Sequence, residues 1–260
     1  MSLDAEPRVR GVPETGLGGL PLLMPGRPET VRVNFGKPIP IFPLPSVPLL
    51  PHAVAPMHIY EARYRQMVEH ALDSSGQIAM AVFQDDDWKQ DYQGRPPVRP
   101  CVCLGQIVQH ERLPDGRYNI LLQGVCRARI RKEFKPEEGV LYRRGLLAPI
   151  GSMPDGEQPD LLEARNRLTD LLSEPPLDQL TAAESVCSCL SDLDTPAIAV
   201  LELIGVSIIT NDRTRYDLLC EGDIERRVDI IEDELLTIRD LLVRGEPQLD
   251  PEAPKGTHNN

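Results

Sequence analysis

The stretch IFPLPSVPLLPHAVAPMHIYEARYRQMV, residues Ile41 to Val68, decides the fold class of this chain. It begins as an apolar run broken by prolines, which suits a strand that does not use all of its backbone donors. No evident loop follows this run. Apolar residues then recur at helical spacing to the end of the stretch and just beyond it, namely Tyr60, Tyr64, Met67, Val68, Ala71 and Leu72. We therefore predict a bent strand pair that leads directly into one amphipathic helix, with Gly76 as its stop.

Strand signals surround this helix between Ile39 and Ile150. The clearest hairpin joins Val108–Glu111 to Tyr118–Leu122 through a Pro-Asp-Gly turn at 114–116. Prolines at 40, 43, 45, 48, 51 and 56 remove backbone donors, so we expect the opening strands to be edges, bulged or bent. The polar segment 84–99 is predicted to be an exposed loop. The result is a small, irregular β pseudo-barrel whose wall is incomplete.

After Gly151, residues that typically start and end helices replace the strand pattern. A first helix is outlined by apolar residues from 161 to 172. Thr181 with Glu184 predicts a capping box for a second, and Thr195 before Pro196 predicts the cap of a third. A short fourth helix is predicted near 213–220.

The final helix has the strongest pattern. Asp223 is its predicted N-cap, and apolar residues recur at 4-3-4-3-4 spacing, namely Ile224, Val228, Ile231, Leu235, Ile238 and Leu242. We therefore predict an α+β fold with four parts. These are a flexible arm at 1–37, a β-rich subdomain at 38–150, a helical bundle at 151–245 and a disordered tail at 246–260.

The composition describes an acidic globular chain. Its 260 residues are 41% hydrophobic, enough for a substantial core, and carry a formal net charge of -12. Only 4% are aromatic. A nucleic-acid surface needs a basic face and stacking rings, so this class of partner is excluded. The N-terminus shows no signal-peptide pattern and no long apolar window occurs, so we predict no membrane segment and a cytoplasmic location.

The sequence contains no combination of residues at a spacing typical of a catalytic or metal-binding site. Cysteines at 101, 103, 126, 187, 189 and 220 lack the spacing of a closed zinc site, and small buried thiols are the favoured interpretation. The five histidines show no ligand spacing. Phosphate-binding loop, nucleophile-elbow and zinc-protease motifs are also missing. We therefore predict a protein that is not an enzyme and that uses no cofactor or metal.

An apolar rim beside the proline-broken strands is the candidate binding site. Partly uncovered residues there would hold an extended apolar peptide by edge pairing and side-chain pockets. The alternative is that the rim forms the inside of the barrel, where large apolar residues are usually found. The candidate residues are Leu49, Leu50, Met57, Ile59, Tyr60, Arg63 and Tyr64.

Two further surfaces each have a functional and an ordinary interpretation. Arg127, Arg129 and Arg131 alternate along a predicted strand, which indicates either a docking strip for an acidic partner or a solvated strand face. The final helix, 223–244, would either pair two copies of the chain into a homodimer or lie in the core of the bundle.

Several motifs, in their order along the chain, resemble the N-terminal domain of Lon proteases. They are IPIFPL at 39–44, MHIYEARY at 57–64, LPDGR at 113–117, QGVCRARI at 123–130 and DIERR at 223–227. The resemblance implies a six-stranded, PUA-like pseudo-barrel with one helix, joined to a helical bundle that helps to recognise protein substrates or partners. The ATPase and Ser-Lys protease modules of full-length Lon have no counterpart in this sequence.

Three positions depart from the family pattern. Ala62 replaces a proline, and Ala128 stands where the family prefers an aromatic residue. His52 stands where the family usually has glycine, and a positive φ there would strain a histidine.

We expect a non-catalytic module that binds exposed apolar segments of client or partner proteins. The alternative is a small-molecule receptor or an adaptor within a larger complex, which a pocket with convergent polar groups would favour. A hydrolase is a third interpretation, and it would require a Ser, Cys or Asp whose replacement abolishes turnover.

Overall fold

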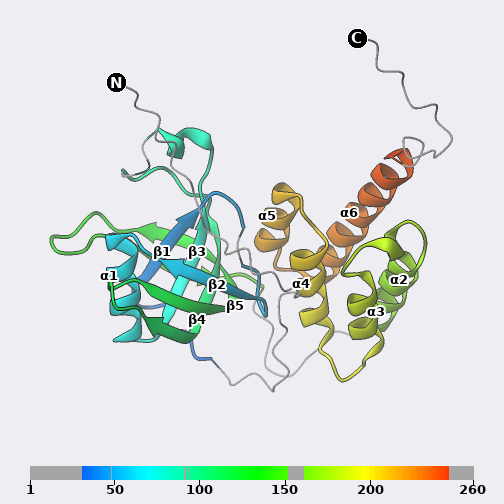
Figure 1. The fold of residues 1–260 in the computed structure, drawn as a ribbon, viewed down its shortest axis with the longest axis horizontal. Coiled ribbons are helices and arrows are strands. Elements are labelled where there is room, and N and C mark those ends of the chain that lie inside the picture. The colour runs from blue at the N-terminus through cyan, green and yellow to red at the C-terminus, as the bar shows by residue number, and fades with distance from the viewer. Residues whose placement is uncertain (1–30, 48, 91, 93, 152–160, 246–260) are drawn as a thin grey trace, which may run out of the picture.

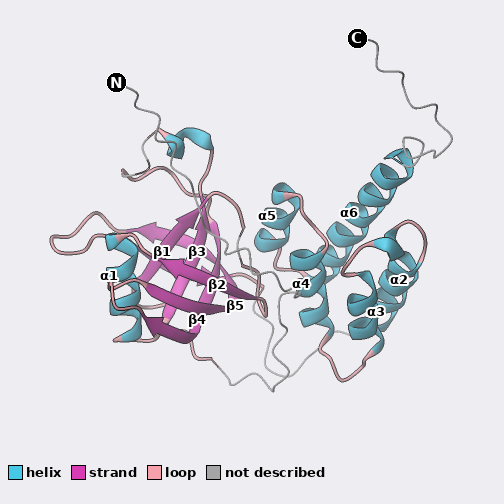
Figure 2. Ribbon diagram, in the orientation of Figure 1, coloured by secondary structure: helices cyan, strands magenta, loops and turns pink. Residues whose placement is uncertain are grey.

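The structure, a computed structural model, describes residues 31–47, 49–90, 92, 94–151 and 161–245. Figure 1 and Figure 2 show the strands gathered on one side of the molecule and most of the helices on the other, which confirms the α+β class. The predicted arm lies outside the described residues up to residue 30, and the predicted tail lies entirely outside them. Val33 and Phe35, at the end of the arm, pack against the sheet.

Six strands form one mixed sheet that curls into a near-barrel ring. The strand order is β2-β5-β4-β3-β1-β6, and an additional pairing between β5 and β6 joins the two sides of the sheet. β1 is parallel to β3, and the other pairings between these strands are antiparallel. The strands are β1 (Ile39–Leu44), β2 (Val54–Ile59), β3 (Gln77–Val82), β4 (Cys101–Arg112), β5 (Tyr118–Glu133) and β6 (Arg143–Pro149).

The proline-containing strand β1 lies inside the ring, so an edge position and an incomplete wall are wrong for β1, whereas β2, which contains Pro56, pairs with β5 alone and is an edge strand. β1 pairs with β6 over 39–41 and with β3 over 41–44. Pro40 therefore faces a paired strand only on the β6 side, and Pro43 only on the β3 side. Because the two pairings are staggered, a missing N–H at either proline is compatible with a central position.

The predicted helix and hairpin are both present. α1 (Ala62–Leu72) buries Tyr64, Met67, Val68 and Ala71 against the sheet, as the apolar spacing predicts. In the hairpin between β4 and β5, Gly116 has a φ of 82° and donates its backbone N–H to the carbonyl oxygen of Leu113 at 2.9 Å. The turn thus uses the positive φ that glycine tolerates best.

The described part of the chain after the sheet is helical. None of its helices has the length and apolarity needed to cross a membrane, and the same holds for the described helices that precede it. The elements are α2 (Leu162–Ser173), η2 (Leu177–Gln179), α3 (Ala183–Ser191), α4 (Ala197–Ser207), α5 (Asp212–Cys220) and α6 (Ile224–Gly245).

Of the three helix caps predicted for this region, one is confirmed. The Asp223 carboxylate accepts hydrogen bonds from the backbone N–H groups of Glu225 and Arg226, at 2.9 and 3.1 Å. The capping box with Thr181 is wrong, because α3 begins after Ala182 without a side-chain cap. The cap at Thr195 is also wrong, because its hydroxyl donates to Asp192 at 2.7 Å and Pro196 takes the N-cap position of α4.

The hydrophobic core consists of three clusters, one of which contains residues from both the sheet region and the helical region. One cluster lies between the sheet and α1, and it also contains Tyr216 and Leu219 from α5. A second fills the helical region, where the first half of the α6 seam is buried at Val228, Ile231 and Leu235. A third, smaller cluster lies within the ring of the sheet. Because α5 contributes to the first cluster, the helical region completes the core of the sheet region.

The two regions also meet at the backbone. Gly151, which follows the sheet, has a φ of 68° and lies against Gly222, which precedes α6. A Cβ added at Gly151 would stand 2.4 Å from the Gly222 carbonyl oxygen. A side chain at this crossing would therefore push the two regions apart.

Candidate functional site

A cavity lies beside the first turn of α1, and we call it the α1 cavity. Its volume is about 500 Å³. Residues 61–64, 94–95 and 140–143 line it together with Pro136. Three segments that are far apart in the sequence thus converge on the helix that the opening motif encodes.

The wall opposite α1 is a loop that the helix itself holds in place. The Gln66 side-chain amide donates to the Gly139 carbonyl oxygen at 2.7 Å, and its carbonyl accepts from the backbone N–H of Leu141 at 2.8 Å. One turn further along, the His70 ring nitrogen Nδ1 and the Tyr142 hydroxyl are hydrogen-bonded at 3.0 Å. These contacts hold the loop backbone around Leu141, whose side chain lines the cavity and is 58% exposed.

Arg63 forms the polar part of the cavity wall. Its guanidinium carbon lies 4.6 Å from the ring centroids of both Tyr64 and Tyr92, which is within cation–π range of each ring. Nε donates to Glu61 at 3.0 Å and Nη1 donates to the Tyr92 carbonyl oxygen at 3.2 Å. The Arg63 Nη2 atom and the Tyr64 hydroxyl are buried without a hydrogen-bond partner among the described residues.

The surroundings of Arg63 change the acidity of this group and its neighbours. Burial opposes the charge on Arg63, but Tyr64, Glu61 and Tyr92 outweigh it and raise its pKa. Burial raises the pKa of Tyr92 to about 12, helped by the hydrogen bond that its hydroxyl donates to Glu61. Burial also raises the pKa of Tyr64. Both tyrosines therefore stay neutral hydrogen-bonding groups near pH 7.

The remaining arginines of the cavity are held by one carboxylate, Glu133. Arg143 donates to both Glu133 oxygens, at 2.8 and 2.6 Å, and Arg95 donates to one of them at 2.7 Å. Burial favours a neutral Glu133, but the bonds from Arg143 and Arg95 are stronger and lower its pKa. These charges are paired, so they shape the wall and are not free to act as general acids or bases.

The structure divides the predicted site residues into two groups. Leu49, Leu50 and Ile59 are almost fully buried in the sheet core, and Met57 is half-buried against it. Of the other three, Arg63 and Tyr64 line the cavity. Tyr60, 47% exposed, is not among the lining residues, and its ring stacks with that of His58 in β2 with centroids 6.4 Å apart.

Sequence reasoning did not identify the other walls of the cavity. The segment 84–99 was expected to be an exposed loop, yet it contains η1 (Asp86–Lys89) and buries Trp88 against Phe83 with ring centroids 5.2 Å apart. Tyr92 follows in the same segment and reaches Arg63. The aromatic residues in an otherwise polar stretch were the available signal, because exposed loops seldom need them.

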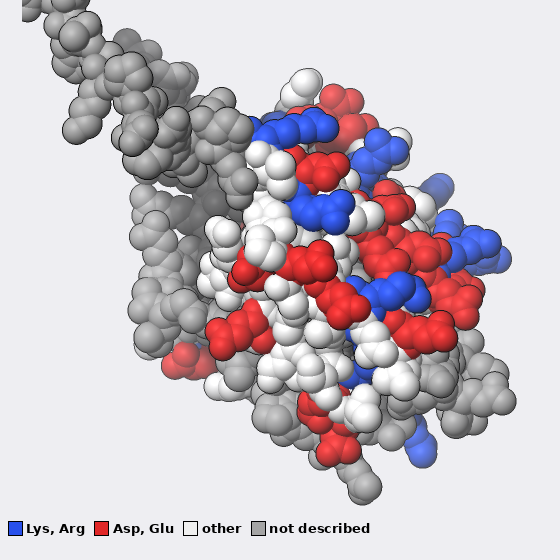
Figure 3. Space-filling model, turned by 90° about the vertical axis from the view of Figure 1, so that its right-hand side faces the viewer, with Lys and Arg blue, Asp and Glu red and all other residues white. Residues whose placement is uncertain are grey.

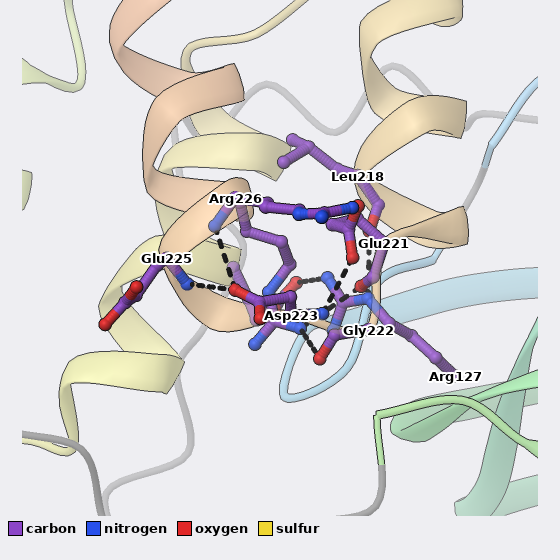
Figure 4. A network of polar contacts seen from close by, with 9 residues as sticks. Arg127, Leu218, Glu221, Gly222, Asp223, Glu225 and Arg226 are labelled. Atoms are coloured by element: carbon purple, nitrogen blue, oxygen red, sulfur yellow. Dashed lines mark hydrogen bonds and ion pairs between the residues drawn. The ribbon is translucent and has the colours of Figure 1, made fainter.

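A second polar cluster joins the sheet to the helical region, and we call Arg127, Glu202 and Arg227 the junction network. Arg127 of β5 donates from Nη2 to Glu202 of α4 at 2.8 Å and from Nε to the Leu218 carbonyl oxygen at 2.9 Å. Arg227 of α6 stands 3.7 Å from the other Glu202 oxygen. Figure 4 shows Arg127 reaching from the sheet toward Leu218 and the turn at Glu221 and Gly222.

This network corrects the prediction for the alternating arginines. Arg129 and Arg131 are exposed, but Arg127 is buried and ion-paired, so the three do not form a common docking strip or solvated face. His52 lies near the network with the positive φ, 66°, that its place in the sequence motif predicts. Burial lowers the pKa of His52, and the nearby arginines lower it further against the opposing effect of Glu202. A neutral His52 adds no third positive charge near pH 7.

The polar groups of both sites are mostly paired with one another. The lining of the α1 cavity includes no Ser, Cys, His or Lys side chain among the described residues. Glu202 is held between two arginines, so it is not available as a base. In the described ranges no three or more His, Cys, Asp or Glu side chains are grouped to hold a metal ion.

Comparison with known proteins gives a family match over most of the chain. Residues 38–237 match the substrate-binding domain of the ATP-dependent protease La (LON). A Lon protease of Desulfovibrio desulfuricans is 32% identical over 124 residues, and one of Escherichia coli is 34% identical over 95 residues. These alignments cover 48% and 35% of this chain but only 13% and 12% of the two proteases.

Two solved structures share the fold. The N-terminal domain of a Lon protease from the Mycobacterium avium complex aligns with a TM-score of 0.56 and 22% identity, covering 76% of this chain and 98% of that one. A Lon N-terminal domain protein from Xanthomonas campestris aligns with a TM-score of 0.52 and 21% identity, covering 74% and 95%. At this level of identity the likeness concerns the arrangement of the elements.

Proposed function

Because the chain belongs to the family of the Lon substrate-binding domain, we propose that it is a non-catalytic module that binds exposed apolar segments of client or partner proteins. The observation that carries this proposal is the α1 cavity, which leaves the large apolar side chain of Leu141 uncovered. Leu141 is 58% exposed and lines the cavity together with Val140 and Pro136. Tyr60, 47% exposed, immediately precedes the lining residue Glu61. Covering such surface is favourable by about 25 cal/mol per Å² of apolar area.

The predicted site residues have distinct roles in this proposal. Tyr60 contacts the client at the rim, together with Leu141. The Arg63 guanidinium is stacked against the Tyr64 and Tyr92 rings, and its unpaired Nη2 would donate to a carbonyl group of the client after a small side-chain movement. Leu49, Leu50, Met57 and Ile59 support β2 and the turn before it from the core side.

The proposal also covers location and catalysis. A cytoplasmic setting agrees with six cysteines that are all free thiols. Binding without proteolysis agrees with a cavity whose arginines are already paired to carboxylates.

A small-molecule receptor or adaptor is the second candidate, favoured by the volume of the cavity. About 500 Å³ lies within the range of small-ligand sites. Under this interpretation the unpartnered Arg63 Nη2 and Tyr64 hydroxyl would recognise a ligand after a small side-chain movement.

Self-association through α6 is a further part of the proposal. The second half of this helix exposes Leu236, Leu241, Leu242 and Val243. On the helical side of the molecule, Figure 3 shows acidic side chains covering more surface than basic ones, with uncharged surface between them. A homodimer would cover the apolar residues, and the acidic surroundings would weaken it at low salt.

The test uses reduced and carbamidomethylated lysozyme as an unfolded client and native lysozyme as the folded comparison. Leu141→Asp is expected to weaken binding of the unfolded client about tenfold, equivalent to about 1.4 kcal/mol, because it places a charge at the apolar rim. The measurement is fluorescence anisotropy with the labelled client.

Leu193→Asp provides the matched control, because Leu193 is also an exposed leucine, at 72%, but lies between α3 and α4. It is expected to leave the affinity unchanged. Equal losses in both variants, or equal binding of folded and unfolded lysozyme, would contradict the proposed site.

A further inference from the structure

The wall of the α1 cavity contains buried polar atoms that the described part of the chain does not satisfy. Tyr64 is only 4% exposed, and its hydroxyl has no hydrogen-bond partner among the described residues. The same holds for Nη2 of Arg63, whose side chain is 18% exposed. Both residues line the cavity. Because a buried polar group without a partner lowers stability, two such groups in one cavity wall indicate a ligand that satisfies them.

The neighbouring polar groups are already committed to other partners. The Tyr92 hydroxyl acts on that of Tyr64, but its own hydrogen is donated to Glu61, so it cannot supply one to Tyr64. Glu61 also accepts from Nε of Arg63 at 3.0 Å, and Nη1 of Arg63 donates to the Tyr92 carbonyl oxygen at 3.2 Å. A guanidinium group donates hydrogen bonds and never accepts them. The ligand must therefore bring an acceptor to Nη2.

The charge of the cavity wall selects among possible acceptors. Three arginines line the cavity, whereas Glu61 supplies the one carboxylate among its described lining residues. Glu133, which is not a lining residue, is shared by Arg95 and Arg143, so even with Glu133 the site has one more positive than negative charge. The side chains of Arg63 and Arg143 are 18% and 12% exposed, so water and salt screen them less than they screen open-surface charges. An anionic acceptor is therefore preferred over a neutral one.

This preference differs from that of the chain as a whole. The net charge of -12 would repel anions in general. Within residues 38–150, however, Lys and Arg slightly outnumber Asp and Glu, so the excess of negative charge comes from the rest of the chain. The α1 cavity thus belongs to the part of the sequence that opposes an anion least.

The rest of the wall determines what the anionic group is attached to. Ala62, Pro136, Val140 and Leu141 give the cavity an apolar side, and Leu141 is 58% exposed. A ligand that fits both sides carries an anionic group at the end of an apolar chain. A carboxylate suits the polar side, because it presents two acceptor oxygens to the two unsatisfied residues.

We propose that the α1 cavity recognises the free C-terminal carboxylate of a protein client, with the preceding apolar residues of the client packed against Leu141 and Val140. This inference rests on the proposed function and names the part of the client that enters the cavity. After a small side-chain movement, Nη2 of Arg63 and the Tyr64 hydroxyl each donate to a carboxylate oxygen. A chain end brings a single length of backbone into the cavity, whereas an internal carboxylate would bring backbone on both of its sides. The volume of about 500 Å³, that of a small-ligand site, favours the chain end.

The experiment compares fluorescein-labelled peptides that differ in the position of their carboxylate. Two have the sequence Gly-Ser-Gly-Ala-Leu-Val-Leu, one with a free C-terminal carboxylate and one with a C-terminal amide, which keeps a carbonyl acceptor without the charge. Fluorescence anisotropy with the full chain at pH 7 is expected to show about tenfold tighter binding of the acid, because charge-assisted hydrogen bonds are the stronger kind. A third peptide, the amide with Glu in place of Ala, tests an internal carboxylate and is expected to bind like the plain amide.

Tyr64→Phe tests one of the two proposed donors. It is expected to reduce the preference for the acid from about tenfold to about threefold, since Nη2 of Arg63 remains. Because the Tyr64 hydroxyl has no partner to lose among the described residues, the variant is not expected to have a lower Tm. Tyr118→Phe is the matched control, because Tyr118 is also 4% exposed but does not line the cavity, and its hydroxyl donates to Glu69 at 3.1 Å. It is expected to leave the preference at about tenfold.

The peptide comparison on the unchanged chain decides the proposal even if a variant fails to fold. Equal affinities for the acid and the amide, equal affinities for the acid and the internal-Glu peptide, or no binding of any of them would overturn it. A preference that Tyr64→Phe leaves intact would also overturn it, because the carboxylate would then lie elsewhere. Leu141→Asp separates this inference from the proposed function. If that variant weakens binding of unfolded lysozyme while the acid and the amide bind equally, the cavity binds apolar segments and only the recognition of the carboxylate fails.

Discussion

Glu202→Gln is expected to lower the free energy of unfolding by about 3–5 kcal/mol, the cost of removing one partner from a buried ion pair. Glu202 is only 2% exposed and is the carboxylate between Arg127 and Arg227. Burial lowers the pKa of Arg227, and the Arg127 charge lowers it further. Glutamine keeps the shape and one acceptor oxygen but leaves two guanidinium groups facing each other without a counter-charge.

Urea unfolding, followed by Trp88 fluorescence for the sheet region and by far-UV circular dichroism for the helices, measures this loss. The two probes are expected to give separate transitions in the variant, since the network links the two regions. Glu232→Gln is the matched control, because Glu232 forms a surface ion pair with Arg167 at 2.8 Å. Glu232→Gln is expected to lower the free energy of unfolding by about 0–1 kcal/mol. A change below about 1 kcal/mol in Glu202→Gln would show that the network contributes little.

Gly124→Ala is expected to lower the free energy of unfolding by about 3 kcal/mol, nearly as much as Glu202→Gln. Gly124 lies in β5 and exchanges backbone hydrogen bonds with the turn before β2. Its N–H donates to Ala53 at 2.8 Å, and its carbonyl accepts from His52 at 2.9 Å. A Cβ at this position would stand 2.1 Å from the Leu50 carbonyl oxygen. The obstacle is backbone, so no side-chain rotation relieves it.

Thermal unfolding checks this prediction. For a chain of this size, a loss of about 3 kcal/mol lowers Tm by about 6–12 °C. Gly245→Ala at the end of α6 is the control, because a Cβ there meets no atom within 4 Å. It is expected to leave Tm unchanged or slightly raised, since alanine favours a helix. Equal Tm values for the two variants would mean that the turn moves away from β5 at little cost.

Features encoded by neighbouring residues were predicted well from the sequence. The hairpin at Gly116 and the cap at Asp223 depend on a few consecutive residues with definite conformational preferences. The helix after the proline-rich stretch follows from its apolar spacing alone. The caps at Thr181 and Thr195 failed because a hydroxyl near a helix start has other partners available, such as Asp192 for Thr195.

Features that depend on distant segments were not predicted. The pairing of β5 with β6 closes the ring, and no local pattern in either strand specifies its partner. Burial of Arg127 depends on Glu202, which lies 75 positions further along the chain. Of the predicted site residues only Arg63 and Tyr64 line the α1 cavity, because its other walls come from segments that α1 meets only in the folded chain.

Because α5 contributes to the core of the sheet region, the two regions depend on each other when genes recombine. Tyr216 and Leu219 fill space beneath strands β1 to β5, the last of which ends at Glu133, so the sheet region alone would be left with a gap in its interior. Recombination that joined the sheet region or the helical region to a different partner would expose apolar surface on both regions. Evolution is therefore expected to shuffle this module as a single block.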